Sequence, residues 1–135
     1  MERVIERVTV ARRALATLEE LAYKESASVV ERDAAIQRFE YTFETVWKSA
    51  QAYLREAEGI ELASPKGVVR SAWQVGLLSE EDGRLALDMV NDRNLTSHAY
   101  NERVASAIHA RLGAYAALMD RWLTAISTRT AAIKL

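Results

Sequence analysis

Apolar side chains recur every three or four residues through most of this chain, and this spacing restricts its fold more than any other feature. It places them along one face of an α-helix, whereas a half-buried strand would need strict alternation. The first face holds Val4, Val8, Ala11, Leu15, Leu18 and Ala22, and the second Ile36, Phe39, Phe43, Trp47, Ala50 and Leu54. The last holds Val104, Ile108, Tyr115, Leu118, Trp122 and Ile126, with one polar position, Arg111. One proline and five glycines leave few interruptions. We therefore predict an all-α fold.

Capping residues give approximate limits to these helices. Serine followed by proline suits an N-cap and first helical position, and glycine suits a helix end. The expected helices cover residues 2–24 and 28–57, a short segment from Ser64-Pro65 to near Gly76, a segment from Ser79 towards Arg93, and a last helix that runs nearly to the end of the chain. Short connections make neighbouring helices antiparallel. The prediction is an up-and-down four-helix bundle with an additional short helix, and the apolar spacing lacks the sustained heptads of a coiled coil.

Length and charge limit the classes of function that are open to such a bundle. With 135 residues the chain fits one domain, 1–135, and with no cysteine it has neither disulfides nor thiolate metal sites. No apolar run approaches the roughly 18 residues of a membrane span, so a cytoplasmic protein without membrane contact is the expectation. A formal charge of −1 argues against binding nucleic acid by bulk electrostatics. Any contact with RNA is expected to be local.

Three features that suggest a ligand site are better explained by structure. The aromatic residues Phe39, Phe43 and Trp47 follow the helical spacing of a core rather than that of a base-stacking platform. His109 has no second histidine or carboxylate at ligand spacing, and the acidic run 80–82 suits the start of a helix. We therefore assign no metal site and no cofactor.

The segment 92–101 is the part of the sequence that indicates chemistry. It reads Asp-Arg-Asn-Leu-Thr-Ser-His-Ala-Tyr-Asn and contains Arg93, His98 and Tyr100. A guanidinium stays charged, and an imidazole exchanges protons near neutral pH. Together they are sufficient groups for cleaving an RNA phosphodiester without a metal.

Three blocks of this chain resemble the HEPN domains, and among them the nucleotidyltransferase substrate-binding proteins. The blocks are Arg38-Phe39-Glu40-Tyr41-Thr42-Phe43-Glu44 with Trp47, Ser64-Pro65 leading into Val68-Val69-Arg70, and Asp92 to Asn101. The third block also matches the pattern of the HEPN toxins, in which an arginine, four residues, a histidine, one residue and a tyrosine follow in order. The resemblance implies a HEPN-like bundle that acts with a minimal nucleotidyltransferase.

The resemblance also implies roles for four residues. His98 would act as general base or acid in a metal-independent endoribonuclease, Arg93 would hold the phosphate, and Asn94 would bind substrate. Tyr100 would accept adenylyl groups from the partner nucleotidyltransferase, an antitoxin that thereby silences cleavage of RNA. The family's composite site, built from both subunits, implies a homodimer. The alternative is a non-catalytic subunit that presents a substrate or a nucleotide to the transferase.

The geometry of the third block leaves several possibilities open. On one continuous helix Arg93 and His98 would point about 140° apart. A break near residues 95–97, where Thr96 or Ser97 would cap the last helix, could bring them together, or two copies could meet across a two-fold axis. In a purely structural role Arg93 would pair with a nearby aspartate, Asp92 or Asp88, His98 would be solvated in a first helical turn, and Tyr100 would pack its ring at the end of the bundle.

Overall fold

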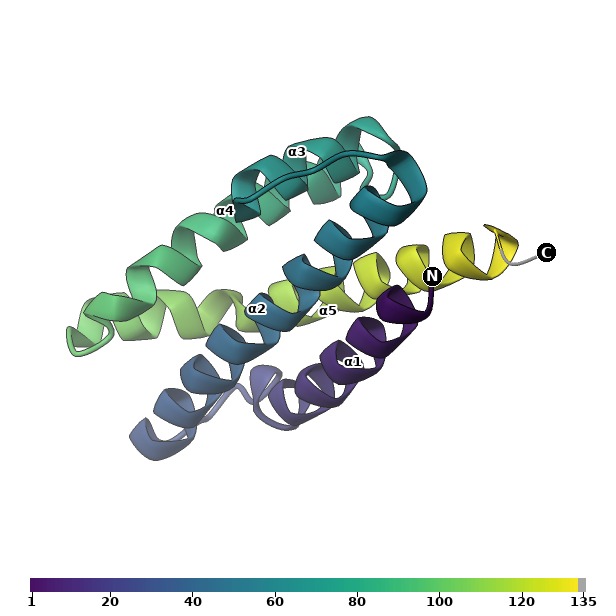
Figure 1. Cartoon of the computed structure of the whole chain (residues 1–135). Helices are drawn as coiled ribbons and strands as arrows, with labels where there is room; N and C mark the ends of the chain where they lie inside the picture. Colours follow the sequence, from purple (N-terminus) through teal and green to yellow (C-terminus); the bar gives the residue numbers. More distant parts are fainter. Residues whose placement is uncertain (134–135) are drawn as a thin grey trace.

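The computed structural model describes residues 1–133, and this part of the chain is helical without a strand. Five α-helices follow in order (Figure 1): α1 (Glu2–Ala22), α2 (Val29–Glu58), α3 (Pro65–Gln74), α4 (Glu80–Leu95) and α5 (Glu102–Ile133). A 3-10 turn, Thr96–His98, lies between α4 and α5. The predicted bundle of four longer helices and one short helix is confirmed.

Three helices, α1, α2 and α5, pack against one another, and the pair α3 and α4 packs onto α2 and α5 (Figure 1). The core between them is aromatic because α2 and α5 both turn rings inward. Phe39 and Phe43 of α2 are at most 1% exposed, and the ring of Phe39 stacks on Tyr115 of α5 with centroids 5.7 Å apart. Trp47 is 8% exposed. The interpretation of this aromatic stripe as core is therefore confirmed.

The helix ends follow the capping residues in the sequence. The hydroxyl of Ser28 accepts a hydrogen bond from the backbone N–H of Glu31, whose carboxylate accepts one from the backbone N–H of Ser28. The hydroxyls of Ser64 and Ser79 likewise accept a backbone N–H at the start of α3 and α4. Gly59 ends α2 with a φ of 68°, a conformation that costs glycine little. Within residues 1–133, no helix combines the length and the apolar character that a membrane span requires.

The start of α5 differs from the prediction that Thr96 or Ser97 would cap it. The helix begins at Glu102, after Asn101, whose side-chain oxygen accepts hydrogen bonds from the backbone N–H groups of Arg103 and Val104. The hydroxyl of Thr96 instead donates to the carbonyl oxygen of Arg93, and that of Ser97 to the carbonyl oxygen of Asn94. These hydroxyls close the end of α4, so they are not available to start α5. The break itself lies where it was expected.

Candidate functional site

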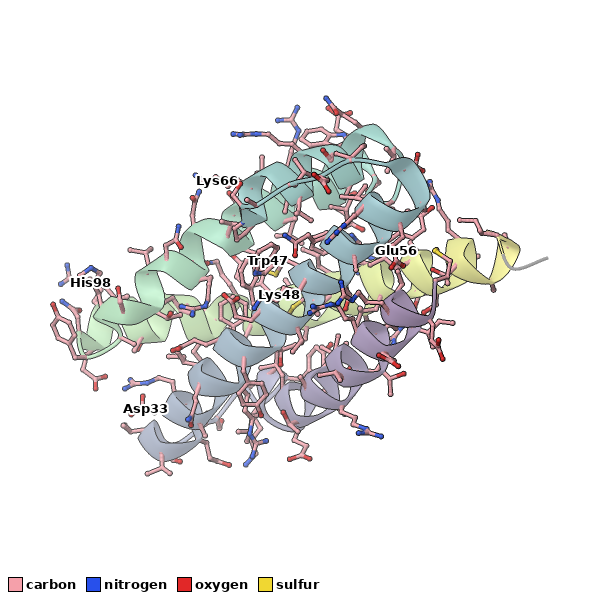
Figure 2. All side chains as sticks on the ribbon, in the orientation of Figure 1. Asp33, Trp47, Lys48, Glu56, Lys66 and His98 are labelled. Carbon is pink, nitrogen blue, oxygen red and sulfur yellow. The ribbon has the colours of Figure 1, made fainter. Side chains whose placement is uncertain are left out.

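The predicted site lies at the end of the bundle where the chain passes from α4 into α5. Arg93 and Asn94 belong to the last turn of α4, His98 ends the 3-10 turn, and Tyr100 lies in the loop before α5. Figure 2 shows His98 at this end, away from the middle of α2 where Trp47 and Lys48 lie. The short turn therefore places all four predicted residues within one segment at the surface.

Arg93 is held within its own chain. Its Nη1 donates a hydrogen bond of 3.0 Å to the hydroxyl of Thr96, and its Nε lies 3.8 Å from a carboxylate oxygen of Glu44 on α2. Glu44 also accepts a hydrogen bond of 3.2 Å from the indole N–H of Trp47. The side chain of Arg93 is 29% exposed, and its Nε is buried without a hydrogen bond. The guanidinium is thus partly desolvated and only loosely paired.

His98 and Tyr100 lie side by side on the surface. The Tyr100 hydroxyl is 3.4 Å from Nδ1 of His98, and the two rings meet edge to face with centroids 6.0 Å apart. Tyr100 is 84% exposed, so its ring does not pack at the end of the bundle as a structural role would require. Both the imidazole and the phenol are accessible to an approaching molecule.

Arg93 and His98 do not share a partner. Within residues 1–133 no hydrogen bond or ion pair joins them, so the break in the helix does not link the two side chains in one chain. The structural alternative was also wrong about the ion pair of Arg93, because Asp92 is engaged elsewhere and Asp88 forms no ion pair in the described range. The side chain of Asn94 is exposed and makes no hydrogen bond there, and its role in binding substrate stays a prediction.

Asp92, Arg111 and Tyr115 form a group that joins α4 to α5, which we call the Asp92 clamp. Asp92 is 5% exposed and accepts hydrogen bonds of 2.6 and 2.8 Å from Nε and Nη2 of Arg111, and one of 2.5 Å from the hydroxyl of Tyr115. Burial, followed by the hydrogen bond to Asp92, raises the pKa of Tyr115 above its ordinary value. The hydrogen bond with Asp92 likewise raises the pKa of Arg111.

Sequence reasoning missed both the Asp92 clamp and Glu44. Arg111 was visible as a polar residue on the apolar face of the last helix, and such a residue needs a partner when its neighbours are buried. Its partner lies 19 positions away, beyond the reach of helical spacing. Glu44 stood in the first block of the family resemblance, but helical spacing gave no sign that it lies beside Arg93.

No group of three or more histidine, cysteine, aspartate or glutamate side chains lies within metal-binding reach of one another in residues 1–133. Of the acidic run at the start of α4, Asp82 pairs with Arg121 at 2.9 Å and Glu80 with Arg84 at 3.0 Å. These carboxylates make surface ion pairs within α4 and between α4 and α5. The sequence interpretation of the run as a helix start agrees with its position.

Comparison with known proteins relates the chain to one protein family. The family model described as "Nucleotidyltransferase substrate binding protein like" matches residues 6–128. A solved structure of a protein from Thermus thermophilus is 64% identical, with a TM-score of 0.85, over 86% of this chain and 98% of that chain. No match was found among curated proteins.

Two more distant structures share the fold. One, from Haemophilus influenzae, is described as revealing the fold of a substrate binding domain of a nucleotidyltransferase; it is 22% identical over 89% of this chain and 98% of that chain, with a TM-score of 0.73. The other is a tri-AMPylated HEPN toxin of Shewanella oneidensis in complex with its MNT antitoxin, 15% identical over 93% of this chain and 96% of that chain, with a TM-score of 0.75. At these identities the likeness concerns the arrangement of helices.

Proposed function

Because this chain belongs to the nucleotidyltransferase substrate binding protein like family, we propose that it acts with a separate minimal nucleotidyltransferase. In this proposal the chain is the RNA-cleaving toxin of a two-gene module, and the transferase is the antitoxin that silences it by adenylylating Tyr100. Cleavage needs no metal and depends on Arg93 and His98.

The observation that carries the proposal is the exposed pair of His98 and Tyr100. A phenol that is 84% exposed, with its hydroxyl 3.4 Å from an imidazole nitrogen, is open to a modifying enzyme. Phosphate groups added there would bring negative charge and bulk next to His98, where RNA has to approach. The tri-AMPylated toxin of Shewanella oneidensis, bound to its MNT antitoxin, supports this proposal through the shared fold.

The chemistry assigned to the site is transfer of a proton and support of a phosphate. His98 takes the proton of a ribose 2′-hydroxyl as this oxygen attacks the adjacent phosphorus, or returns a proton to the leaving 5′-oxygen. Arg93 offsets the charge that grows on the phosphate oxygens. To do so it must exchange the carboxylate of Glu44 for the phosphate, and the separation of 3.8 Å makes this pair easy to replace.

A second copy of the chain completes the site in this proposal. Within residues 1–133 Arg93 and His98 have different partners, and no hydrogen bond or ion pair joins them in one copy. A two-fold axis through this end of the bundle would bring the same segments of two copies face to face. The homodimer is thus part of the proposed mechanism.

One observation favours a second function, that of a non-catalytic subunit presenting a substrate to the transferase. Arg93 is already bonded to Thr96 and paired with Glu44, which suits a structural arginine as well as a phosphate ligand. In this case the exposed Tyr100 would be the substrate that is presented. The two functions predict the same partner and differ only in cleavage of RNA.

Cleavage of a mixed single-stranded RNA in excess EDTA tests the proposal. The purified chain, His98→Ala, and chain pre-incubated with the transferase and ATP are compared, with His109→Ala as the control because it removes the chain's other histidine. Activity that is lost in His98→Ala and after pre-incubation, but kept in His109→Ala, supports the ribonuclease. A wild-type chain that binds the transferase yet leaves RNA intact refutes it in favour of the presenting subunit.

A further inference from the structure

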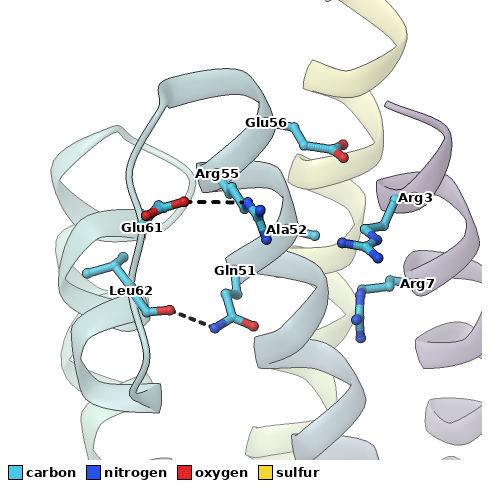
Figure 3. A pocket seen from close by; sticks show the side chains of 8 residues that line it. All are labelled: Arg3, Arg7, Gln51, Ala52, Arg55, Glu56, Glu61 and Leu62. Atoms are coloured by element: carbon cyan, nitrogen blue, oxygen red, sulfur yellow. Dashed lines mark hydrogen bonds and ion pairs between the residues drawn. The ribbon is translucent and has the colours of Figure 1, made fainter.

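A groove runs between α1 and α2. Lys48, which Figure 2 labels on α2, is one of its lining residues. The groove consists of two adjoining hollows, of about 240 and about 510 Å³, which share Arg3 and Arg7 as lining residues. Figure 3 shows both arginines reaching from α1 towards α2, opposite Gln51. We call this feature, lined by Arg3, Arg7, Lys48, Gln51 and Arg55 among others, the α1–α2 groove.

The loop after α2 gives this groove a fixed end. The side-chain amide of Gln51 donates a hydrogen bond of 2.6 Å to the carbonyl oxygen of Leu62, and Arg55 lies 3.7 Å from Glu61 (Figure 3). These contacts tie the chain that follows Gly59 back against α2. This end of the groove is therefore held in place by contacts between α2 and the loop that follows it.

In the part of the chain that the structure describes, several of the cations that line the α1–α2 groove have no carboxylate partner. Its lining includes four cations, Arg3, Arg7, Lys48 and Arg55, and four carboxylates, Glu6, Glu44, Glu56 and Glu61. Arg55 is near Glu61, and Glu44 is near Arg93 outside the groove. Within the described residues Arg3, Arg7 and Lys48 have no carboxylate within 4 Å. Glu56 lies 3.7 Å from the N-terminal ammonium group of Met1. Arg3, Arg7 and Lys48, all exposed, therefore share the groove with one carboxylate that has no cationic partner within residues 1–133, that of Glu6.

One end of the groove adjoins Arg93 of the candidate site. Glu44 lines its larger hollow, and the same carboxylate lies 3.8 Å from Nε of Arg93. From Glu44 to Arg55 the groove follows about eleven residues of α2, which at about 1.5 Å per residue is a length of roughly 16 Å. Several successive phosphates of a nucleic-acid strand fit along such a length.

We propose that the α1–α2 groove binds the backbone phosphates of the single-stranded RNA whose scissile phosphate lies at Arg93. The inference rests on the proposed ribonuclease function for the identity of the ligand. Arginine donates paired hydrogen bonds to phosphate oxygens, and a row of cations along a groove is the usual device for following a strand. No aromatic side chain lines either hollow, so the bases have no stacking platform there, and binding is tolerant of sequence.

Binding of a fluorescein-labelled, 2′-O-methylated single-stranded RNA tests the groove without cleavage, because this RNA lacks the attacking hydroxyl. Fluorescence anisotropy is measured for the wild-type chain, for Arg3→Ala/Arg7→Ala and for Arg13→Ala. Arg13 is the matched control, since it is an exposed arginine of α1 that lines neither hollow. Thermal unfolding of each variant verifies that the bundle is intact.

The salt dependence of binding gives the expected result. Each phosphate contact contributes about 0.7 to the slope of log affinity against log salt for single strands, so the double variant loses about 1.4. Between about 50 and 200 mM NaCl the wild-type chain then loses about sevenfold more affinity than the double variant. Lys48→Ala is expected to lower the slope by about 0.7, and Arg13→Ala to leave it unchanged.

Three outcomes would overturn the inference. The first is a slope for the double variant equal to that of Arg13→Ala, and the second is no measurable binding of the 2′-O-methylated RNA by the wild-type chain. The third is displacement of the RNA from Arg3 and Arg7 by ATP or inorganic tripolyphosphate as effectively as by unlabelled RNA. That result would make the groove a site for a mononucleotide. The cleavage assay separates this inference from the proposed function. Cleavage that depends on His98, with unchanged binding in the double variant, refutes the groove alone. Binding that depends on Arg3 and Arg7, without cleavage by the wild-type chain, refutes the ribonuclease and the scissile phosphate at Arg93, and leaves the groove as a site for backbone phosphates.

Discussion

Replacing Asp92 by alanine is expected to destabilise the bundle strongly, although Asp92 is one of nineteen acidic residues in the chain. Its carboxylate is buried and accepts three hydrogen bonds, two from Arg111 and one from Tyr115. Alanine removes all three acceptor contacts at once. The hydroxyl of Tyr115, a residue that is 0% exposed, then has no partner in the protein.

The magnitude follows from the two partners taken separately. A buried hydroxyl without a hydrogen bond costs about 1–3 kcal/mol. Arg111 is different because its side chain is 46% exposed and regains water when the carboxylate is removed. We therefore count only about 1 kcal/mol for this ion pair, well below the value for a fully buried one. Together the loss in the free energy of unfolding is about 3 kcal/mol, or a decrease of about 10 °C in Tm for a domain of this size.

Urea unfolding followed by circular dichroism measures this loss, with Asp88→Ala as the matched control. Asp88 lies one turn earlier on α4, is exposed and forms no ion pair within the described residues, so its replacement is expected to cost less than about 0.5 kcal/mol. Tyr115→Phe and Arg111→Ala complete a double-mutant cycle with Asp92→Ala. A loss below about 1 kcal/mol for Asp92→Ala, or one equal to that of Asp88→Ala, would refute the reasoning.

Three further perturbations have expected outcomes. Gly83→Ala places a Cβ 2.5 Å from the ring of Trp73, so overpacking should outweigh the gain in helix propensity and lower stability by about 1–2 kcal/mol in urea unfolding; a more stable variant would contradict the close approach of α3 and α4. Because the pKa of Tyr115 is raised in the folded state, its phenol stabilises the fold fully below pH 10, the ordinary pKa, and less as the pH rises towards the folded-state pKa. The urea midpoint of unfolding should therefore decrease less steeply above pH 10 in Tyr115→Phe than in the wild-type chain, and equal decreases would argue against this cause. Glu44→Gln should change stability by less than about 1 kcal/mol, since its pair with Arg93 is long and partly exposed; a loss of about 2 kcal/mol or more would show that this pair is a major stabilising contact.

The helices could be predicted because their apolar spacing and caps are local properties of the sequence. Ser64 and Ser79 cap the helices that they were expected to cap, since each directly precedes residues that suit a first helical turn. The start of α5 was harder because Thr96, Ser97 and Asn101 are all good capping residues close together in the chain. Which of them caps the helix depends on where their side-chain oxygens find partners, and the sequence does not contain this information.

The candidate site could be located from the sequence, but its internal contacts could not. Arg93, His98 and Tyr100 were identified by their spacing and by family resemblance. That Arg93 faces Glu44 depends on how α4 lies against α2, a helix far away in the chain. The partner of Arg111 likewise follows from the packing of α5 on α4. Both contacts arise when the helices assemble, so periodicity within one helix does not reveal them.

Two neighbouring residues of α4 are held by different helices, and this limits how the site can move. Asp92 is bonded to α5 and Arg93 is paired with α2, and consecutive side chains on a helix point about 100° apart. Rotation of α4 about its own axis would break the short bonds of the Asp92 clamp as well as the longer pair of Arg93. The cheaper way for Arg93 to leave Glu44 is rotation about its own side-chain bonds, which leaves the Asp92 clamp intact and needs no microsecond movement of the helix.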